Sequence, residues 1–412
     1  MTMKLSKELE WRGFVNQTTY KTHSEVDEDP ITFYFGVDPS APSMTIGNLA
    51  AAMMVRHFID HGHKAVLLVG GATGMIGDPD GKGEERELKS PEELKVNKSA
   101  IAGQYKQIFG GQDFKLVDNY DWFKDIGYLQ FLRDVGKHVP MRQMLGRDFV
   151  QKRLGEDGTG ISYAEFSYVL IQAYDFLHMN REMGVTLQLC GSDQWGNSIA
   201  GVDLIRRISG KEAHVWSAPL VINKTTGTKF GKSEDGAIWL DDNLTSVYKF
   251  YQFWLNVDDD GVEDYLKIYT FLEKEEIEKI ISGFKQNPGE RLAQKTLAYE
   301  VTKLVHGDDR AKAVKKVSEV LFGTGKFLDL GSGEIEILSS ELKVVKGSDD
   351  FSETLVTAGL AASKTEARNF YGSGAISVNG EKVTPDSPYK FRKGLNLIKR
   401  GKNNFALVKE KD

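Results

Sequence analysis

Short apolar segments that each stop at a turn are the feature that most constrains the fold. Residues 65–69 (AVLLV) form a continuous apolar run that stops at Gly70, as expected of a parallel strand buried on both faces. Residues 31–37 (ITFYFGV) are rich in β-branched and aromatic side chains, and a helical pattern follows them. Residues 186–189 are a third strand candidate. Strands that alternate with helices in this way predict a Rossmann-like, doubly wound parallel sheet of the α/β class.

The pattern changes along the chain, which predicts several domains. Residues 1–222 hold the α/β pattern, and residues 223–322 begin with a polar loop and then become helical. Residues 323–349 contain glycine, serine and charged residues with little periodicity, so we expect a linker there. Residues 350–412 have two helical stretches and a hairpin signal at Asn379-Gly380, which predicts a small α+β module.

Charge is distributed unevenly. The 412 residues carry a net charge of -6, but residues 351–412 hold 11 basic and 6 acidic residues and are therefore net positive. A basic tail on an acidic body suggests a polyanion as partner of the tail. The alternative is a tail whose lysines are simply solvated.

Composition excludes several classes of protein. The only cysteine is Cys190, so an intramolecular disulfide framework and a multi-cysteine zinc site are ruled out. No run of about 18 apolar residues is present, and we expect no membrane span. The first ten residues lack the apolar core of a signal peptide, so a reducing compartment inside the cell is expected. His57 and His61 are spaced by four but lack the glutamate of a zinc-protease motif, and no metal site is predicted.

Two polar segments are candidates for binding phosphate. After Asp38 a turn with small and hydroxyl residues leads to a helix that begins near Gly47, and a helix N-terminus offers free N–H groups to an anion. Residues 229–233 (KFGKS) lie in a polar loop whose two lysines would stabilise a transferring phosphoryl group. The alternatives are an ordinary strand-to-helix turn and a solvated surface loop.

Tyr168, Gln172 and Asp175 form a polar stripe, because their spacing places them on one face of a helix. The residues between them are mostly apolar, so the stripe is not expected to face bulk water. Buried polar groups need partners, which here are either other protein groups or a small zwitterionic ligand.

Glycine-rich segments follow two of the predicted strands. Residues 70–79 (GGATGMIGDP) and 191–197 (GSDQWGN) each indicate either close approach of a ligand or a tight loop. In the second segment Asp193 is placed to accept a hydrogen bond from a ribose hydroxyl, or alternatively to cap the following helix.

Taken in their order along the chain, these segments resemble the class I aminoacyl-tRNA synthetases. Residues 45–48 (TIGN) resemble the HIGH region, and residues 229–233 resemble the KMSKS loop. The segments YFGVD, GGATGMIGDP, SYVLIQAYDF and GSDQWGN are similar to those of the bacterial-type tyrosyl-tRNA synthetase family. In the tail, residues 358–368 and 376–380 resemble an RNA-binding module that this family shares with a ribosomal small-subunit protein.

The resemblance implies a role for each matching residue. The phenol of tyrosine would be held by Tyr34 and Asp175, its ammonium by Asp78, Tyr168 and Gln172, and Gln194 would lie near the carboxylate. The adenylate would be faced by Gly36, Asp38, Gly191 and Asp193, and the HIGH-like residues Gly47 and Asn48 belong to the same nucleotide site. The ATP phosphates would be surrounded by Ser40, Thr45, Lys229 and Lys232, with Ser233 ending the loop. Transfer RNA would be contacted by Arg206 and Arg207, and in the tail motif by Lys364 and Arg368.

The reaction implied by the resemblance has two steps. L-Tyrosine attacks the α-phosphate of ATP, which arrives with Mg²⁺, and the adenylate then passes tyrosine to the terminal adenosine of tRNA(Tyr). Catalysis would come from positioning and electrostatic stabilisation, without an enzyme nucleophile or a protein-bound metal. The resemblance also implies a cytoplasmic homodimer.

Three residues depart from the family pattern. Thr45 and Asn48 stand where HIGH has histidines, and Phe35 stands where a cysteine is frequent. Threonine and asparagine both donate hydrogen bonds, so nucleotide contacts would survive with altered geometry, whereas Phe35 donates none.

Two other functions remain open at this stage. A tryptophanyl-tRNA synthetase is the nearest alternative enzyme, although a tyrosine–aspartate pair suits a phenol better than an indole. A catalytically inactive relative that binds RNA is the alternative from another class, favoured by the altered HIGH region and opposed by the retained lysines.

Overall fold

A computed structural model describes residues 3–79, 87–233 and 236–410, and the side chains of Asp148, Lys232 and Ser233 also lie outside the description. By internal contacts the chain divides into two units. The first comprises residues 1–245 and 257–297, and the second comprises residues 246–256 and 298–412. This division differs from the domain boundaries predicted above, because helices of residues 257–297 belong with the N-terminal sheet.

The first unit is built on a six-stranded sheet in the order β1-β6-β5-β2-β3-β4. Its strands are β1 (Gln17–Thr18), β2 (Thr32–Val37), β3 (Lys64–Val69), β4 (Phe114–Asp118), β5 (Leu187–Gly191) and β6 (His214–Ala218). Five of them run parallel, and β1 pairs antiparallel with β6 at one edge. The predicted doubly wound α/β sheet is thus confirmed, with an antiparallel edge strand added.

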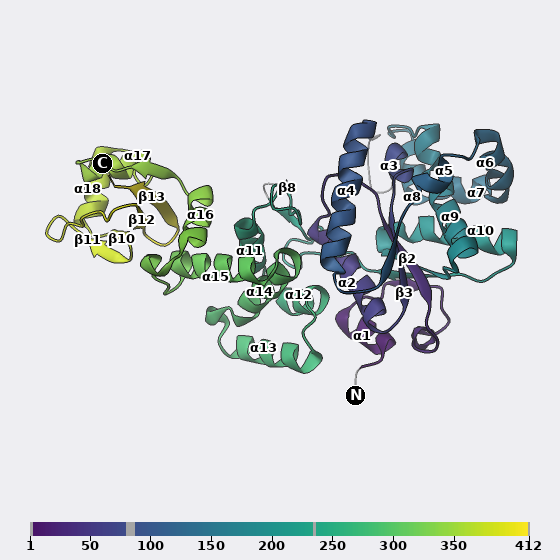
Figure 1. The fold of residues 1–412 in the computed structure, drawn as a ribbon, viewed down its shortest axis with the longest axis horizontal. Helices are drawn as coiled ribbons and strands as arrows, with labels where there is room; N and C mark the ends of the chain where they lie inside the picture. Colours follow the sequence, from purple (N-terminus) through teal and green to yellow (C-terminus); the bar gives the residue numbers. More distant parts are fainter. Residues whose placement is uncertain (1–2, 80–86, 234–235, 411–412) are drawn as a thin grey trace. The chain divides into compact units, whose positions relative to one another are not determined.

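Helices cover both faces of this sheet. Figure 1 shows α2 (Ile46–Asp60) and α4 (Pro91–Ile108) on one face and α9 (Tyr163–Met183) and α10 (Trp195–Ser209) on the other. Shorter helices lie around them: α1 (Leu5–Arg12), α3 (Thr73–Ile76), α5 (Tyr120–Phe123), α6 (Tyr128–Asp134), α7 (Met141–Leu145) and α8 (Asp148–Leu154). The unit also contains β7 (Lys232–Ser233), β8 (Gly236–Ala237), α12 (Val262–Tyr269) and α13 (Lys274–Gln286). None of the described helices is long and apolar enough to cross a membrane.

The sequence explains why the central elements form. All of β3 after its first residue is buried, as its unbroken apolar run predicts for a strand covered on both faces. Ser162 is the N-cap of helix α9, and its hydroxyl accepts a hydrogen bond from the N–H of Glu165. Gly184 is the C-cap, with φ 68°, a left-handed conformation that favours glycine. These caps fix the start and end of the helix that carries the predicted polar stripe.

The second unit combines helices with a small sheet. The helices are α11 (Val247–Leu255), α15 (Asp308–Phe322), α16 (Ser332–Glu341), α17 (Phe351–Thr357) and α18 (Lys364–Gly372), while α14 (Leu292–His306) spans the boundary between the units. The sheet, in the order β11-β10-β12-β13-β9, contains β9 (Val344–Lys346), β10 (Ile376–Val378), β11 (Glu381–Val383), β12 (Leu395–Arg400) and β13 (Asn404–Lys409). The predicted hairpin is present, with positive φ at both Asn379 and Gly380.

Residues 323–349 are not an irregular linker. They contain α16 and β9, and β9 adds a parallel strand to the C-terminal sheet beside β13. Leu338 of α16 is buried in a cluster with Val317 of α15 and Leu407 of β13. The sequence did not predict α16 because few of its side chains are buried, which leaves little helical periodicity. It did not predict β9 because three residues are too few for an alternating pattern.

A buried histidine makes the folded state sensitive to acid. His63 is 7% exposed, and its Nδ1 accepts a hydrogen bond from the N–H of Ile31 at 3.0 Å. Burial, together with nearby His61, lowers the pKa of His63 to about 4. Since the unfolded chain titrates near pH 6.5, it takes up the proton first as the pH falls, and stability is lost below that pH.

We therefore expect the free energy of unfolding to fall between pH 7.5 and 5.5, with about 1 kcal/mol of the loss due to His63. In His63→Asn the side-chain oxygen takes the position of Nδ1 and can still accept from Ile31, but it does not titrate in this range. Urea unfolding at both pH values should show a pH dependence about 1 kcal/mol smaller in the variant. Equal pH dependence in the two proteins would contradict this role of His63.

Candidate active site

The carboxyl ends of the parallel strands bring together residues that are distant in the sequence. Asp38 follows β2, and it accepts hydrogen bonds from the Thr73 hydroxyl at 2.6 Å and the Tyr168 hydroxyl at 2.7 Å. Asn119, which follows β4, donates to the Thr73 hydroxyl at 3.0 Å. A single hydrogen-bond network therefore joins the ends of three strands to α9. This edge is where open α/β sheets bind their ligands.

The predicted polar stripe of α9 faces this network. Its last member, Asp175, is 2% exposed and accepts from Asn119 Nδ2 at 3.0 Å and from Trp122 Nε1 at 2.9 Å. Burial raises the pKa of Asp175 to about 8, although the two donors oppose that shift. Gln172 has a buried Oε1 with no hydrogen-bond partner among the described residues. Two members of the stripe thus bond protein groups, whereas Gln172 keeps an unused acceptor, and the ligand interpretation of the stripe stays a prediction.

Tyr34 lies in the same region on β2 with its hydroxyl buried. The residue is 2% exposed, and its Oη has no partner among the residues that the structure describes. Burial and the nearby Asp175 carboxylate raise the pKa of Tyr34 well above its usual value. A buried hydroxyl without a partner is costly, which indicates that a polar group of a ligand can complete this site.

Asp78 and Gln194 lie next to each other. Gln194 Nε2 donates to a carboxylate oxygen of Asp78, and Gln194 Oε1 accepts from Asn197 at 3.1 Å. Both side chains are half-buried. The structure thus joins the glycine-rich segment after β3 to the one after β5.

The glycines after β3 are required by the protein itself. A Cβ at Gly70 would lie 2.1 Å from Asp38 Oδ1, and one at Gly71 would lie 2.1 Å from Asp118 Oδ1. Asp118 Oδ1 also accepts from the N–H of Gly71 at 3.2 Å. Of the two interpretations of this segment, the tight loop accounts for both glycines.

The HIGH-like residues cap α2. Thr45 is the N-cap, and its N–H and hydroxyl donate to Asn48 Oδ1 at 2.9 and 3.0 Å. The two departures from the family pattern therefore bond each other through Asn48 Oδ1, and the amide NH₂ of Asn48 is not used in this pair. Gly47 is exposed, and a Cβ there would meet nothing closer than 3.5 Å. Phe35 is buried with its ring edge-on to Tyr105, so it is a core residue.

The lysine-containing loop lies against the same helix N-terminus. Gly231 has φ 93°, and a Cβ there would lie 2.6 Å from Ile46, the first residue of α2. Ile238 joins the two segments, because its N–H donates to the Gly231 carbonyl and its carbonyl accepts from the N–H of Ile46. Lys229 is exposed, while the side chains of Lys232 and Ser233 lie outside the described residues.

The remaining predicted residues lie on surfaces. Gly36, Ser40 and Asp193 are exposed, and Gly191 ends β5, where a Cβ would lie 2.6 Å from Asp193 Oδ1. Arg206 pairs with Asp203 at 2.7 Å, and Arg207 donates to the His138 carbonyl at 3.0 Å. On α18, Lys364 lies 3.3 Å from Asp350, and Arg368 is exposed.

Asn119 and Trp122 are the site residues that sequence reasoning missed. Both follow β4, whose residues FKLVD are only partly buried, so the strand lacks the apolar run that marks β3. A polar residue directly after a weak edge strand was the only available signal.

Comparison with known proteins decides the family. The family model for class I tRNA synthetases (W and Y) matches residues 26–323, and that for the C-terminal domain of tyrosine–tRNA ligases matches residues 336–408. The tyrosine–tRNA ligase of Geobacillus kaustophilus is 44% identical over 99% of this chain and 100% of its own length. This chain belongs to the tyrosine–tRNA ligase family.

Other comparisons agree with this assignment. The tyrosine–tRNA ligase of Bacillus caldotenax is 44% identical over the same shares of both chains. A C-terminally truncated mitochondrial tyrosyl-tRNA synthetase of Aspergillus nidulans is 33% identical, with a TM-score of 0.70 over 78% of this chain and 95% of that one. The chain is therefore a ligase of the class I aminoacyl-tRNA synthetases, as its motifs predicted, and ATP is a substrate of this class.

Proposed function

We propose that the carboxyl edge of the sheet is where this chain activates tyrosine with ATP and then joins it to tRNA. The observation that carries the proposal is the buried Tyr34 hydroxyl, which lacks a partner among the described residues and lies close to the Asp175 carboxylate. A phenol satisfies both groups, because its oxygen accepts from Tyr34 and its O–H donates to Asp175. An indole has no acceptor for Tyr34, which disfavours tryptophan.

The other end of the amino acid meets groups of matching charge. Asp78, Tyr168 and Gln172 offer a carboxylate, a hydroxyl and the unused Oε1 to the ammonium, and Gln194 lies beside Asp78, near the carboxylate. The adenylate lies along Gly36, Asp38, Gly191 and Asp193, with Asp193 on the ribose. The nucleotide reaches the N-terminus of α2, where Gly47 leaves room and Asn48 keeps a donor.

The phosphates of ATP face the loop and the turn before α2. Lys229, Lys232, Ser40, Thr45 and Ser233 supply cationic and hydroxyl groups, and ATP arrives as its Mg²⁺ complex. As pyrophosphate leaves, negative charge accumulates on its oxygens. Lysines that bind the transition state more strongly than bound ATP accelerate the reaction. The tyrosine pocket positions the attacking carboxylate, and the nucleotide site positions the α-phosphate, so that the two reacting groups lie next to each other.

Tyrosine-dependent ATP–pyrophosphate exchange tests this proposal. We expect exchange with tyrosine and none above background with phenylalanine or tryptophan at equal concentration. Exchange with tryptophan would assign the site to a tryptophanyl-tRNA synthetase. A folded protein that exchanges with none of the three would refute activation at this site and favour a chain that only binds RNA.

The C-terminal module is the proposed second contact with tRNA. Its residues 351–412 carry the excess of positive charge, and Arg368 is exposed on α18. Lys364 on the same helix lies 3.3 Å from Asp350 and 3.7 Å from Glu353. These two carboxylates offset its positive charge and so weaken its attraction for a polyanion. Arg206 and Arg207 on α10 are the proposed contacts with the acceptor end of tRNA.

Arg368→Glu is expected to raise KM for tRNA several-fold and to leave tyrosine-dependent exchange unchanged. The loss of one phosphate contact should also lower the slope of log KM against log salt by about 1. The control is Lys326→Glu, the same charge change at an exposed residue before the module. Deletion of residues 351–412 is a poorer test, because β12 and β13 cover buried Val317 and Leu338. Equal effects of both substitutions on charging would argue against a contact at Arg368.

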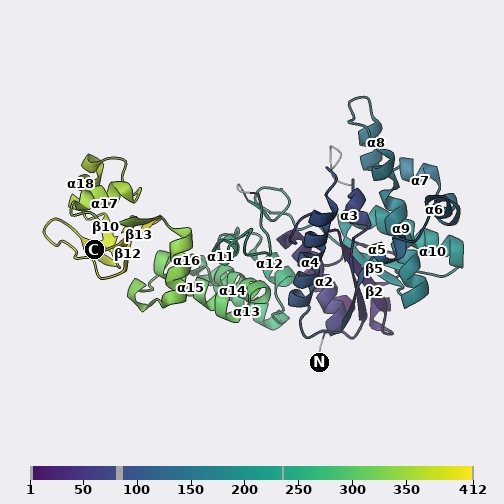
Figure 2. The ribbon, with the colours of Figure 1, turned by 45° about the horizontal axis from the view of Figure 1, so that its top comes forward.

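We also propose that the active form is a cytoplasmic homodimer. Helices α6, α7 and α9 belong to the same part of the first unit (Figure 2). Large apolar side chains on them are exposed, among them Leu129 (79%), Tyr163 (61%) and Met141 (58%). Exposed apolar groups that gather on one side of a protein mark an interaction surface. Sedimentation over a range of concentrations should give twice the chain mass, and a monomer at micromolar concentration would refute the dimer.

A further inference from the structure

The described part of the lysine loop, residues 223–231, has one apolar anchor. Residues 224–229 are all exposed, whereas Phe230, between Lys229 and Gly231, is 8% exposed. The ring of Phe230 stacks on that of Tyr265 in α12, with ring centroids 4.2 Å apart and an interplanar angle of 24°. A stacked aromatic pair that excludes water holds two segments together more strongly than the surrounding solvated side chains do.

Tyr265 is itself fixed in place. It is 1% exposed, and its hydroxyl donates to Asp258 Oδ2 at 3.2 Å. A Cβ at Gly261 would lie 2.5 Å from the ring, so the ring rests directly on the backbone of that glycine. A second tether joins the same loop to the same helix, because Lys224 forms an ion pair with Asp264.

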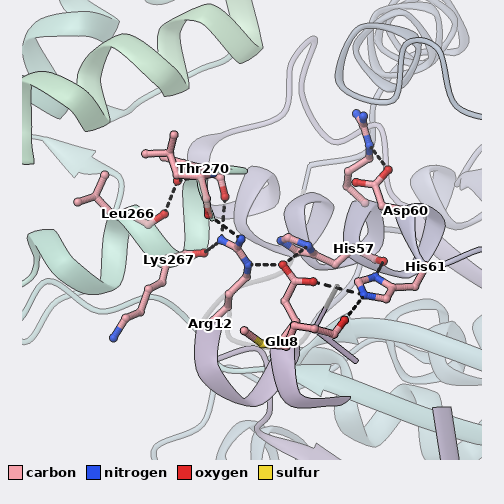
Figure 3. Close-up of polar contacts among 11 residues, drawn as sticks. Glu8, Arg12, His57, Asp60, His61, Leu266, Lys267 and Thr270 are labelled. Carbon is pink, nitrogen blue, oxygen red and sulfur yellow. Dashed lines mark hydrogen bonds and ion pairs between the residues drawn. The ribbon is translucent and has the colours of Figure 1, made fainter. Parts of the chain in front are cut away.

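Helix α12 is anchored in turn to the sheet-bearing part of its unit. It packs against α1 and α2, and Arg12 of α1 reaches its C-terminal end. Figure 3 shows the Arg12 guanidinium donating to the carbonyls of Lys267 at 2.9 Å and Thr270 at 3.0 Å, and it also donates to the Leu272 carbonyl. The carbonyls of Lys267 and Thr270 lie at the C-terminal end of α12, where a cation stabilises the negative end of the helix dipole.

Glu8 completes this anchor. Its carboxylate lies 2.9 Å from Arg12 Nε, 3.3 Å from Nδ1 of His57 in α2 and 3.5 Å from Nε2 of His61, which follows α2 (Figure 3). Arg12 and His57 are both buried, whereas Glu8 and His61 are partly exposed, so the centre of the cluster is shielded from solvent. The chain of contacts runs from α2, whose N-terminus is the proposed phosphate site, through α1 and α12 to the loop.

We propose that Phe230 and Tyr265 are positioning residues, which hold the loop on α12 so that Lys229 and Lys232 reach the ATP phosphates. The proposal rests on the function proposed above for the two lysines. Without the Phe230 ring the loop loses its aromatic packing on Tyr265 and on Tyr269, whose ring centroids lie 4.2 and 5.9 Å away. The Lys224–Asp264 pair also joins the loop to α12, but it is exposed, and exposed pairs contribute little. The loop then spends less time in the competent position, and the rate falls with that fraction.

The test is a double-mutant cycle between Phe230→Ala and Lys229→Ala, read by the rapid-quench rate of tyrosyl-adenylate formation. Phe230→Ala should lower this rate about tenfold or more while the tyrosine dissociation constant stays within about twofold. Lys229→Ala should slow the wild-type protein strongly but slow the Phe230→Ala protein much less, because the lysine is already misplaced. Phe230→Tyr, which keeps the ring, should restore most of the rate.

Phe284→Ala on α13 is the matched control. Phe284 is 7% exposed, so its truncation should cost similar stability, yet it should leave adenylate formation unchanged. If Phe230→Ala does not fold, Phe230→Leu replaces it in the cycle, since it keeps apolar volume and removes only the ring.

The outcomes separate the two proposals. A full effect of Lys229→Ala in both backgrounds would overturn the positioning role and leave the lysine's catalytic role intact. No effect of Lys229→Ala in the wild-type background would refute the catalytic role itself. An unchanged rate in Phe230→Ala, or an equal loss in Phe284→Ala, would also overturn the positioning role.

Discussion

Asp175→Asn is expected to lower kcat/KM for tyrosine about 100-fold and to change kcat/KM for phenylalanine by less than about threefold. An oxygen of the Asp175 carboxyl group accepts a hydrogen bond from the phenol O–H, whereas the amide of asparagine is a weaker acceptor that also turns an N–H donor toward the pocket. A site built around a hydroxyl rejects the analogue without one, and tyrosine against phenylalanine is itself the standard example of this rule. Exchange assays with tyrosine, and with phenylalanine at a far higher concentration that makes its slow exchange detectable, measure the two kcat/KM values.

The companion variant Tyr34→Phe separates specificity from folding. The Tyr34 hydroxyl has no partner among the described residues, so its removal should leave the free energy of unfolding unchanged or raise it. Asp175→Asn disturbs the bonds to Asn119 and Trp122 and is expected to cost stability. Tyr34→Phe should lower kcat/KM for tyrosine by about tenfold, the value of one hydrogen bond. Equal losses for tyrosine and phenylalanine in either variant would contradict a phenol site.

Strong local patterns made the sheet predictable. The apolar run of β3 and the β-branched strand β2 each end at a turn, and these signals locate the strands to within a residue or two. The edge strand β4 alternates poorly and is half-exposed, so it escaped notice together with Asn119 behind it. In residues 323–349 the burial of Leu338 depends on strands more than 50 residues further along the chain, which no local pattern records.

The site was predictable where spacing alone determines proximity. Tyr168, Gln172 and Asp175 share a helix face because the helix repeat dictates it. The partners of the stripe come from segments that follow the strands of the sheet. The sequence therefore did not predict the hydrogen bond from the Tyr168 hydroxyl to Asp38. The anchor at Arg12 was equally hidden, because its acceptors are backbone carbonyls and a carbonyl has no sequence signature.

Lys229→Ala and Lys232→Ala should each lower the rate of tyrosyl-adenylate formation by about 10²–10³, the usual cost of removing one group that stabilises transition-state charge. Tyrosine binding should be unaffected, because the proposed contacts with its phenol, Tyr34 and Asp175, lie on β2 and α9 and not on the loop. A fall in rate without a change in tyrosine affinity is what an interaction made only in the transition state predicts. Rapid-quench kinetics and equilibrium dialysis measure the two quantities.

Lys64→Ala is the matched control for both lysines. Lys64 is exposed at the amino end of β3, whereas the proposed site lies at the carboxyl ends of the strands. The substitution Lys64→Ala therefore removes the same charge from a residue that does not contact ATP. If the loop lysines acted only through the overall field of the protein, all three variants would lose rate to the same small extent, and high salt would remove the difference. A large loss confined to Lys229 and Lys232 would instead indicate that these two side chains interact more strongly with the transition state than with bound ATP.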